Sequence, residues 1–378
     1  MSDDASGNKE KARGRRRMMG NFAFILHPLD IDYMVPFEPK IKKHSPALVE
    51  KVMEWTPPWK LSDITGVRSL TGRELSGWFI GCPLLPKQMI TLDLEFVLRK
   101  IIQSGEVAQE LGAKIVGLGA FTSVVGDAGI TVANNLEIAV TTGSSYTIAS
   151  AMESIQKLTK MMDVDLPSVR VAVIGATGAI GSVCSKILAK EVSDLILVGR
   201  NQERINKLVN NISEFSLGKV EGSLDVQGSA KKSQVIVTAT SATAALIGPD
   251  DLLSGAIVCD VAQPRNVSAE VASARDDVVV IEGGVIEVPG DKVDFHFDFG
   301  FPPGLAFACM SETMILALEE RYENFSLGRD IDVGKAEEIS RLAKKHGFKL
   351  AGFRSFDKPI SDEQIERIKE KAKASRKP

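Results

Sequence analysis

The chain has 378 residues, of which 44% are hydrophobic and 25% are charged, and this composition is typical of folded globular proteins. Its formal net charge of -3 lacks the basic excess of dedicated nucleic-acid-binding proteins, so no nucleic-acid partner is expected. The sequence contains no apolar run long enough to cross a bilayer, so no integral membrane segment is expected either.

The cysteines indicate the cellular compartment. They are far apart in the sequence and include no CxxC pair: Cys82, Cys184, Cys259 and Cys309. This spacing predicts neither a disulfide framework nor a zinc site, so no metal is expected. A reducing, cytoplasmic compartment fits a chain whose thiols are few and separated.

The N-terminal part of the chain alternates strand-like and helical stretches. Residues 1–20 are polar and basic, and we expect them to form a disordered extension. Residues 21–165 predict an α/β substrate domain, because short apolar runs alternate with stretches of helical periodicity. The expected strands are Phe22–Leu26, Gly77–Ile80, Lys114–Leu118 and Glu137–Val140, and the expected helices are Leu92–Leu111 and Tyr146–Met162.

From Val169 onward the alternation becomes regular. The strands expected here are Val169–Ile174, Asp194–Val198, Lys219–Leu224, Gln234–Ala239, Ala256–Asp260 and Val278–Ile281, with helices at Ala179–Lys190 and Glu203–Ile212. These strands are apolar without strict alternation, as in a parallel sheet that helices cover on both faces. Residues 166–300 therefore predict a doubly wound Rossmann domain within an α/β chain.

The C-terminal part is expected to be mainly helical. After Pro302 and Pro303, a strongly apolar helix is predicted to run to about Tyr322 and to pack back on the first domain or on the cleft between the domains. We assign residues 301–356 to this helical segment. Residues 357–378 predict a charged tail with an exposed helix at Asp362–Ala374.

A glycine-rich loop follows the first Rossmann strand. Gly175, Gly178 and Gly181 stand in a GxxGxxG spacing between this strand and its helix. The first glycine allows a sharp turn, the second leaves room for a pyrophosphate, and the third lets the helix pack closely on the strand. The phosphates would then lie at the helix start. The loop residues expected to bind a dinucleotide are Gly175, Thr177, Gly178, Ala179 and Ile180.

The end of the second Rossmann strand selects the cofactor. NAD sites usually place an Asp or Glu there to bind the ribose hydroxyls, whereas this chain has Arg200. Arg200 and Arg204 can pair with a 2′-phosphate, and Asn201 can donate hydrogen bonds, so the pattern favours NADPH. Three residues near the ends of later strands are also expected to border the cofactor: Thr240, Gly283 and Gly284.

Cys309 stands near the start of the apolar helix after Pro303. A helix N-terminus favours the thiolate, so we expect a lowered pKa for this thiol. A thiolate is also a natural acceptor of an acyl group from another thioester. Taken alone, a cysteine flanked by Phe307, Ala308 and Met310 is more often a packed core residue.

Several other sequence blocks occur with Cys309 in a fixed order: Leu118–Ser123, Thr141–Gly143, Gly175–Ser182, Arg200–Arg204, Gly283–Glu287 and Asn324–Arg329. With Cys309 they resemble the cyanobacterial long-chain acyl-[acyl-carrier-protein] reductases, over roughly residues 21–350. The blocks at Arg200–Arg204 and Asn324–Arg329 are the more specific ones, because the glycine loop alone would fit many dehydrogenases.

The resemblance implies an NADPH-dependent enzyme that reduces a fatty acyl thioester to the aldehyde, with Cys309 as the nucleophile. An oxyanion forms when the thioester is attacked and again when it is reduced. Its candidate donors are backbone N–H groups at the helix start and the side chains of Ser123 and Thr142. The resemblance also implies an acyl tunnel in the N-terminal domain, and an aldehyde-consuming enzyme is a further candidate partner.

One segment departs from the family pattern. Val288–Pro303 differs in sequence and is shorter than the corresponding family stretch, and it leads directly into Cys309. This difference leaves open the acyl chain length and the choice between acyl carrier protein and coenzyme A as the substrate carrier.

Other titratable side chains are weaker candidates. His296 can donate a proton to the leaving thiol, but its alternating Phe/polar surroundings fit a half-buried strand with the histidine outward. Glu287 has a similar status. The remaining histidines lie far from these blocks and are expected to be structural or exposed: His27, His44 and His346.

Two other functions remain open at the level of sequence. One is a dehydrogenase related to shikimate dehydrogenases, which reduces a small carbonyl without covalent catalysis. Such enzymes use a Lys/Asp pair, and no convincing pair is present, since Lys114 lies in an expected strand and Asp127 in the following loop. The other is a nucleotide-binding sensor or scaffold without catalytic activity.

Overall fold

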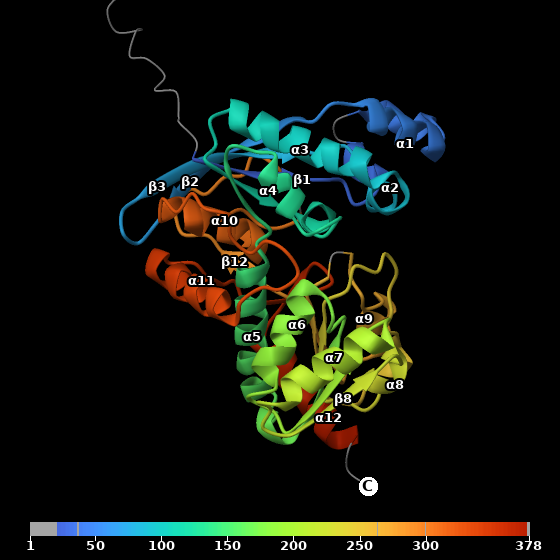
Figure 1. Cartoon of the computed structure of the whole chain (residues 1–378). Helices are drawn as coiled ribbons and strands as arrows, with labels where there is room; N and C mark the ends of the chain where they lie inside the picture. The colour runs from blue at the N-terminus through green and yellow to red at the C-terminus, as the bar shows by residue number, and fades with distance from the viewer. Residues whose placement is uncertain (1–20, 36–37, 263, 299, 376–378) are drawn as a thin grey trace, which may run out of the picture.

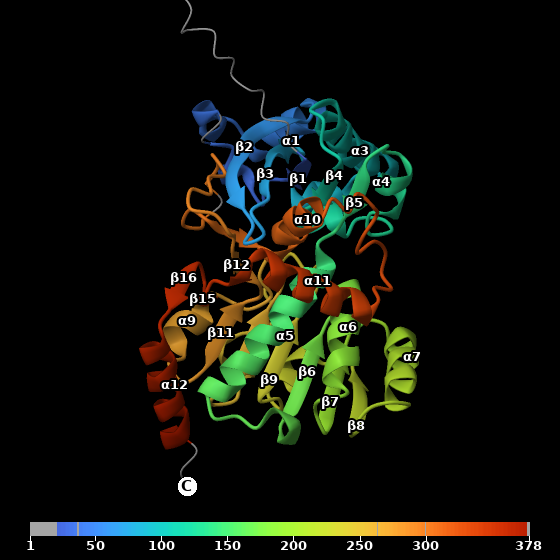
Figure 2. The ribbon, with the colours of Figure 1, turned by 90° about the vertical axis from the view of Figure 1, so that its left-hand side faces the viewer.

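The computed structural model describes residues 21–35, 38–262, 264–298 and 300–375, so the expected disorder of residues 1–20 lies outside the described residues. Its helices are α1 Pro46–Trp55, α2 Pro86–Thr91, α3 Leu94–Glu110, α4 Ile130–Asn134, α5 Ser144–Met161, α6 Ala179–Leu188, α7 Gln202–Ser213, α8 Val226–Ala230, α9 Glu270–Ala274, α10 Ala308–Leu318, α11 Val333–His346 and α12 Asp362–Ser375. Figures 1 and 2 show one sheet above the other. Helix α5 runs from the upper part of the molecule down along the lower sheet.

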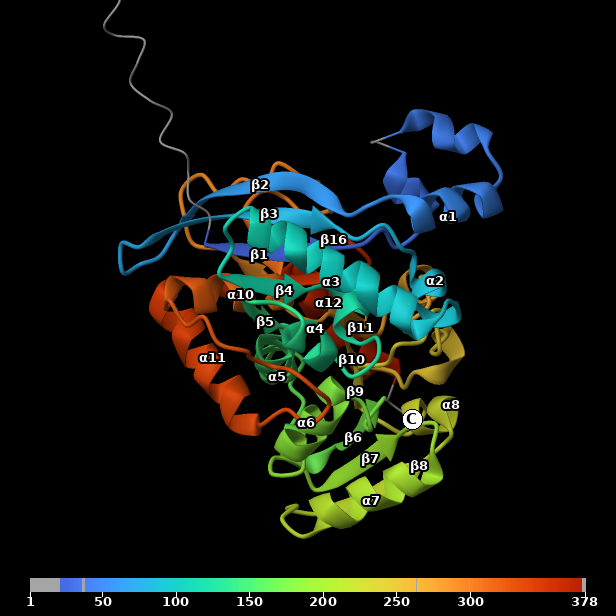
Figure 3. The ribbon, with the colours of Figure 1, turned by 45° about the horizontal axis from the view of Figure 1, so that its top comes forward.

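The first sheet has its strands in the order β2-β3-β1-β4-β5. Their bounds are β1 Phe22–Leu26, β2 Trp59–Arg68, β3 Glu74–Gly81, β4 Ile115–Leu118 and β5 Ala139–Thr141. β2 is antiparallel to β3, and the remaining pairs are parallel. Because successive residues of a strand face opposite ways, Phe22 and Phe24 join the core around α10, whereas Ala23 and Ile25 join the core around α3. Figure 3 shows α3 across the outer face of this sheet.

The second sheet is parallel throughout, with the order β11-β10-β9-β6-β7-β8. Its strands are β6 Arg170–Ile174, β7 Asp194–Val198, β8 Lys219–Ser223, β9 Val235–Thr238, β10 Ile257–Asp260 and β11 Val279–Glu282. The core on one face contains residues of α5, α6 and α7, and the core on the other face contains residues of α8 and α9. This strand order is that of dinucleotide-binding folds, so the predicted doubly wound Rossmann fold is confirmed.

Short antiparallel strands precede the apolar helix α10. β12 Val285–Glu287 pairs with β13 Leu305–Phe307 and with β14 Lys349–Leu350. Because Leu305–Phe307 is held in this ladder, the helix begins at Ala308 and not directly after Pro303. It also ends at Leu318, before the expected Tyr322. The helix packs on the first sheet and on α5, which is one of the two places where we expected it.

The charged tail is docked on the second sheet. A hairpin of β15 Phe353–Ser355 and β16 Lys358–Ile360 leads into α12. The predicted helix is present, but it is not wholly exposed, because Ile365 and Ala372 are buried against the molecule. Figure 2 shows α12 beside α9 and β11. Among the described helices, none is both long and apolar enough to cross a membrane.

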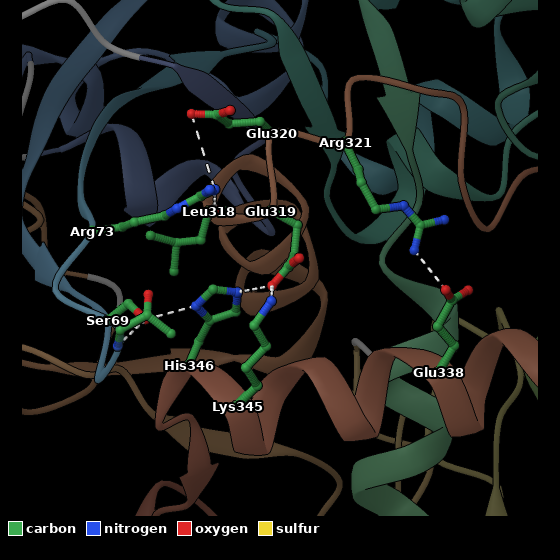
Figure 4. Close-up of polar contacts among 10 residues, drawn as sticks. Ser69, Arg73, Leu318, Glu319, Glu320, Arg321, Glu338, Lys345 and His346 are labelled. Atoms are coloured by element: carbon green, nitrogen blue, oxygen red, sulfur yellow. Dashed lines mark hydrogen bonds and ion pairs between the residues drawn. The ribbon is translucent and has the colours of Figure 1, made fainter.

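Polar side chains fix the end of α10 to the β2–β3 turn and to α11 (Figure 4). The buried ring of His346 contacts Ser69 Oγ through Nδ1 at 2.7 Å and Glu319 Oε1 through Nε2 at 2.5 Å. Lys345 Nζ also donates to Glu319 Oε1, at 2.5 Å. His346 is therefore structural, one of the two alternatives expected for it, and it holds the far end of the helix that begins near the cysteine.

Candidate active site

A cavity of about 620 Å³ lies between the two sheets. One part of its wall comes from the glycine loop and from Arg200 and Arg204, and another part contains Cys309 with its neighbours Ala308 and Met310. The structure thus brings the predicted cofactor residues and the predicted nucleophile to one enclosed space.

The glycine loop forms a cradle that side chains would fill. Gly175 has φ +85°, and a Cβ there would lie 2.5 Å from the carbonyl oxygen of Ala239. A Cβ on Gly181 would lie 2.2 Å from the carbonyl oxygen of Gly175. Gly178 is the N-cap of α6, so the unpaired N–H groups of this helix start open onto the cavity. The cavity wall here contains Gly175, Thr177, Gly178, Ala179 and Ile180.

Arg200 and Arg204 follow β7 on the cavity wall. Both side chains are exposed, and neither forms an ion pair with a carboxylate in the described part of the chain. Two uncompensated guanidinium groups fit a phosphate in addition to the pyrophosphate. Asn201 is the N-cap of α7, where its Oδ1 accepts from the Arg204 N–H at 2.9 Å, so its carbonyl end is already used.

Of the three residues expected near the ends of later strands, two line the cavity and one does not. Thr240 and Gly283 line the cavity, as expected. Gly284 does not belong to the lining and instead contacts the start of α10, where its carbonyl accepts from the Ala308 N–H at 2.8 Å. With φ +74° and a Cβ position 2.4 Å from Ser150 Oγ, this residue lets α5 and α10 approach each other.

Cys309 lies where two helix N-termini meet. It is the second residue of α10, whose N-cap is Phe307. The N-cap of α5 is Gly143, and a Cβ on that glycine would lie 2.3 Å from the Cys309 Cα atom. The positive ends of both helix dipoles therefore converge on the region in front of the sulfur.

Burial nevertheless has the largest influence on the pKa of the Cys309 thiol. Desolvation raises the pKa of Cys309 to about 12, and the charge of Glu312 acts in the same direction. A hydrogen bond from the Met310 N–H favours the thiolate but is the weaker influence. The expected lowered pKa is therefore wrong for the free protein, because removal from water outweighs the helix dipole.

Glu312 is a buried carboxyl group beside Cys309 that the sequence analysis did not single out. Its side chain is fully buried, one turn beyond Cys309. Oε1 accepts from Thr141 Oγ1 at 2.5 Å, and Oε2 accepts from the Tyr146 N–H at 2.8 Å. These bonds join α10 to the last residue of β5 and to the first turn of α5. The signal was a single glutamate within an otherwise apolar helix, since carboxylates are almost never fully buried without partners.

The proposed oxyanion donors Ser123 and Thr142 both line the cavity. Each hydroxyl has one proton, and each proton already has an acceptor. Ser123 donates to the carbonyl of Ala120 at 2.6 Å, and Thr142 donates to the carbonyl of Ser326 at 2.5 Å. At the two helix starts, the N–H groups of Ala308 and Tyr146 also have acceptors, Gly284 and Glu312, so only the other N–H groups of these first turns remain as candidate donors.

His27 lies in the cavity wall, although it is far from the sequence blocks and was not expected at the site. Its Nε2 accepts from the Phe121 N–H at 3.1 Å, and Nδ1 donates to the carbonyl of Pro28 at 3.0 Å. Burial lowers the pKa of His27 to about 4, so the ring is neutral and holds the loop that carries Ser123.

The other titratable candidates lie outside the cavity. His296 is exposed and contacts the carbonyl of Asp63 at 3.1 Å, in an irregular segment and not in the half-buried strand that its surroundings suggested. Glu287 pairs with Lys349 at 3.2 Å. The cysteines are all free, and three of them are fully buried in the packed cores: Cys82, Cys184 and Cys259.

Comparison with known proteins identifies the family. The family model for shikimate / quinate 5-dehydrogenase matches residues 132–282, which contain α5 and the second sheet. A long-chain acyl-[acyl-carrier-protein] reductase from Synechococcus elongatus is 31% identical over 314 residues, covering 77% of this chain and 87% of the relative. The chain belongs to the long-chain acyl-[acyl-carrier-protein] reductase family. As a member of this reductase family, it is an oxidoreductase that uses a nicotinamide cofactor.

Two further similar proteins differ in how much of their own length this chain spans. The aminotransferase PigE from a Serratia species is 29% identical over 310 residues, covering 80% of this chain, and the chain spans only 36% of that protein. A 5-ketofructose reductase structure from a Gluconobacter species covers 86% of this chain and 99% of its own at 11% identity. Its TM-score of 0.35 is too low to carry an argument.

Proposed function

We propose that the chain reduces a fatty acyl thioester to the aldehyde with NADPH, through an acyl-enzyme on Cys309. The observation that carries the proposal is the shared cavity, whose wall contains the glycine loop, Arg200, Arg204 and Cys309. A dinucleotide held at the start of α6 would extend from the arginines toward the cysteine. Membership of the acyl-[acyl-carrier-protein] reductase family supports the same chemistry.

Cys309 is the residue that accepts the acyl group. Its sulfur forms a bond to the thioester carbonyl carbon while the bond to the carrier sulfur breaks, and the proton of the Cys309 thiol leaves with the carrier thiol. When bound, NADPH supplies the hydride that reduces the resulting Cys309 thioester to the aldehyde. The bond to Cys309 then breaks, and the sulfur regains a proton from water.

The two helix starts supply the charge stabilisation. During attack and during reduction, the carbonyl oxygen carries negative charge, which the positive ends of the α5 and α10 dipoles stabilise beside Cys309. Glu312 positions these helix starts, because it ties Thr141 and the Tyr146 N–H to α10. Ser123 and Thr142 can add a hydrogen bond only after leaving the carbonyls that they contact in the structure.

The rest of the cavity suits a fatty chain. Apolar side chains of the first sheet and of the segment before Cys309 line it: Phe24, Leu26, Trp59, Leu61 and Phe297. Each methylene buried against such a wall contributes about 0.8 kcal/mol. Longer chains are therefore expected to bind more tightly until the cavity is filled.

The test uses the purified protein with NADPH and acyl thioesters of several chain lengths. We expect loss of the reduced nicotinamide absorbance, formation of aldehyde, and an acyl adduct on Cys309 by mass spectrometry. Cys309→Ser should abolish turnover by at least about 1,000-fold, because the nucleophile is lost. The matched control, Cys184→Ala, removes a buried thiol of α6 that does not line the cavity and should retain activity.

Two outcomes would overturn the proposal. One is an absence of NADPH oxidation with acyl groups on both acyl carrier protein and coenzyme A. The other is a Cys309→Ser variant that keeps the wild-type rate. Retained activity of that variant on a small carbonyl compound would favour the shikimate-dehydrogenase-like reaction instead.

A further inference from the structure

The outer face of α1 is apolar and uncovered. Leu48, Val52 and Trp55 stand at helical spacing on one side of the helix and are 50%, 57% and 80% exposed. The other side of α1 holds it to the molecule, through Val49 and Met53, which are buried. The packing of α1 therefore does not use this stripe, which we call the α1 stripe.

Uncompensated lysines lie beside the α1 stripe. Lys40, Lys42 and Lys43 belong to the 3-10 turn Pro39–Lys43 that precedes α1, and all of them are exposed. None of these lysines forms an ion pair within the described residues. The carboxylates of the same segment are already engaged: Glu38 with the Lys40 N–H, Glu50 with Lys87, and Glu54 with Lys51. Within Glu38–Lys43, three lysines stand against one carboxylate, Glu38, whose contact with a backbone N–H leaves its charge in place, so this turn carries an excess of positive charge next to the apolar side chains.

The segment connects two parts of the Cys309 cavity wall. The chain leaves the cavity wall after Tyr33 and Met34, forms α1, and returns to the wall at Trp59. Leu29 lines this cavity and also a second one of about 960 Å³, which lies between α1, α2 and loops of the second sheet. Figure 3 shows α1 standing out at the edge of the first sheet, away from the body of the molecule.

We propose that α1 and the turn before it bind the surface of an anionic lipid bilayer. Interfacial helices insert an apolar face, commonly with a Trp, about 5–10 Å into the boundary of headgroups and acyl chains. Trp55 at the end of the α1 stripe matches this role. Lys40, Lys42 and Lys43 contact the anionic headgroups, which attract basic residues close to the surface.

The shape of the surface favours a bilayer over a protein partner. The α1 stripe is a convex ridge on one helix of ten residues, and a protein would need a matching groove to cover it. Stable protein interfaces bury about 800 Å² on each partner, more than three side chains provide. A bilayer closes around a protruding side chain without any preformed complementarity.

The position of α1 near the Cys309 cavity suggests why the protein would bind a bilayer, and this reason rests on the proposed function. A long-chain substrate or aldehyde is poorly soluble in water, and a bilayer beside the cavity offers it an apolar phase. Binding to the bilayer itself requires neither NADPH nor turnover. A failure of the lipid contact is therefore distinguishable from a failure of the reductase chemistry.

The experiment is co-sedimentation of the full chain with vesicles of phosphatidylcholine, with and without phosphatidylglycerol, at low and high salt. We expect binding to the anionic vesicles at low salt and its loss at high salt. Lys40→Glu/Lys42→Glu/Lys43→Glu should lower the partition coefficient by at least about 100-fold, because each lysine near an anionic surface contributes about fivefold. Val52→Ser/Trp55→Ser should lower it by at least about tenfold.

The matched controls change the same residue types elsewhere. Lys160→Glu/Lys232→Glu/Lys344→Glu reverses exposed lysines on other elements, and Leu70→Ser removes an apolar side chain that is 77% exposed in the β2–β3 turn. Both controls should bind vesicles like the wild type. Failure of the wild type to bind anionic vesicles, or equal loss in controls and variants, would overturn the proposal. The proposal would also be overturned if the lysine and Val52/Trp55 variants bound vesicles like the wild type and lost only self-association or only binding to an acyl carrier protein.

Discussion

At the scale of single residues, Cys309 experiences opposing influences. The start of α10 and the Met310 N–H favour the thiolate, whereas burial and the nearby Glu312 favour the thiol. A charge at an exposed helix terminus is typically stabilised by up to about 1 kcal/mol, and one pKa unit corresponds to about 1.36 kcal/mol. Desolvation, which raises the pKa of Cys309 to about 12, therefore prevails over the helix dipole. The free protein holds this thiol in the neutral form.

We predict that Cys309 in the ligand-free protein reacts slowly with iodoacetamide near pH 7. Because its pKa is raised to about 12, the thiolate fraction and the alkylation rate should increase about tenfold per pH unit through the alkaline range. Mass spectrometry of the labelled cysteine measures the rate. Glu320→Gln, at an exposed position after α10, should leave this pH dependence unchanged. A plateau of the rate near neutral pH would contradict the prediction.

The glycines that the sequence predicts for the cofactor loop depend on local backbone geometry. Gly175 and Gly178 are needed by the turn between β6 and α6, and both their partners lie within the same loop or one strand away. The titration of Cys309 depends instead on its burial by distant segments. His27 and Glu312 were missed for the same reason, since their partners are 94 and 171 residues away, at Phe121 and Thr141.

At the scale of elements, α10 is anchored at both ends. Its start contacts Gly284 and Gly143, and its C-terminal Glu319 contacts His346 (Figure 4). A helix held at only one end would let the sulfur of Cys309 move relative to the cofactor cradle. The cluster at the far end thus keeps the active-site geometry without contacting substrate.

We predict that His346→Gln lowers the free energy of unfolding by about 1–3 kcal/mol at pH 8, because buried polar partners lose their hydrogen bonds. Burial lowers the pKa of His346 below its usual 6.5 in the folded chain, although Glu319 opposes this shift. The unfolded chain therefore binds the proton more readily. The stabilisation by neutral His346 is complete above about pH 6.5 and is lost as the pH falls toward the folded value.

Urea unfolding at several pH values measures both effects. Wild-type stability should decrease between about pH 7 and pH 5 more steeply than that of His346→Gln. His44→Gln changes an exposed histidine and should follow the wild type. Equal pH slopes for wild type and His346→Gln would contradict the role assigned to the cluster.

The elements that sequence predicted well are the strands and helices of the second sheet. Most strands there are short apolar runs, and the first two are each followed directly by a helix, so the pattern is local. β2 was missed because register shifts between Lys60 and Ser62 and between Ile64 and Val67 interrupt the two-residue alternation. β13 has three residues and forms only because β12 and the distant chain near β14 lie beside it.

At the scale of the whole molecule, the cavity couples the two sheets. Its wall combines Phe24 and Trp59 from the first sheet region with Gly178 and Arg204 from the second. A ligand that fills this space contacts both parts, so its binding free energy adds to the stability of both. Binding should therefore shift the unfolding of the molecule as a unit, not the unfolding of one sheet alone.

We predict that NADPH raises the thermal midpoint of the full chain more than NADH does at the same concentration. A ligand at 100 times its Kd stabilises the folded state by about 2.7 kcal/mol, and Arg200 and Arg204 provide the additional affinity for the 2′-phosphate. Differential scanning calorimetry should show one transition that moves upward as a whole. In Arg200→Ala/Arg204→Ala, NADPH and NADH should act alike, because only the cations that read the phosphate have been removed. Arg341→Ala, an exposed arginine on α11, should keep the difference. A double variant that still prefers NADPH would assign the choice of cofactor to other residues of the cavity.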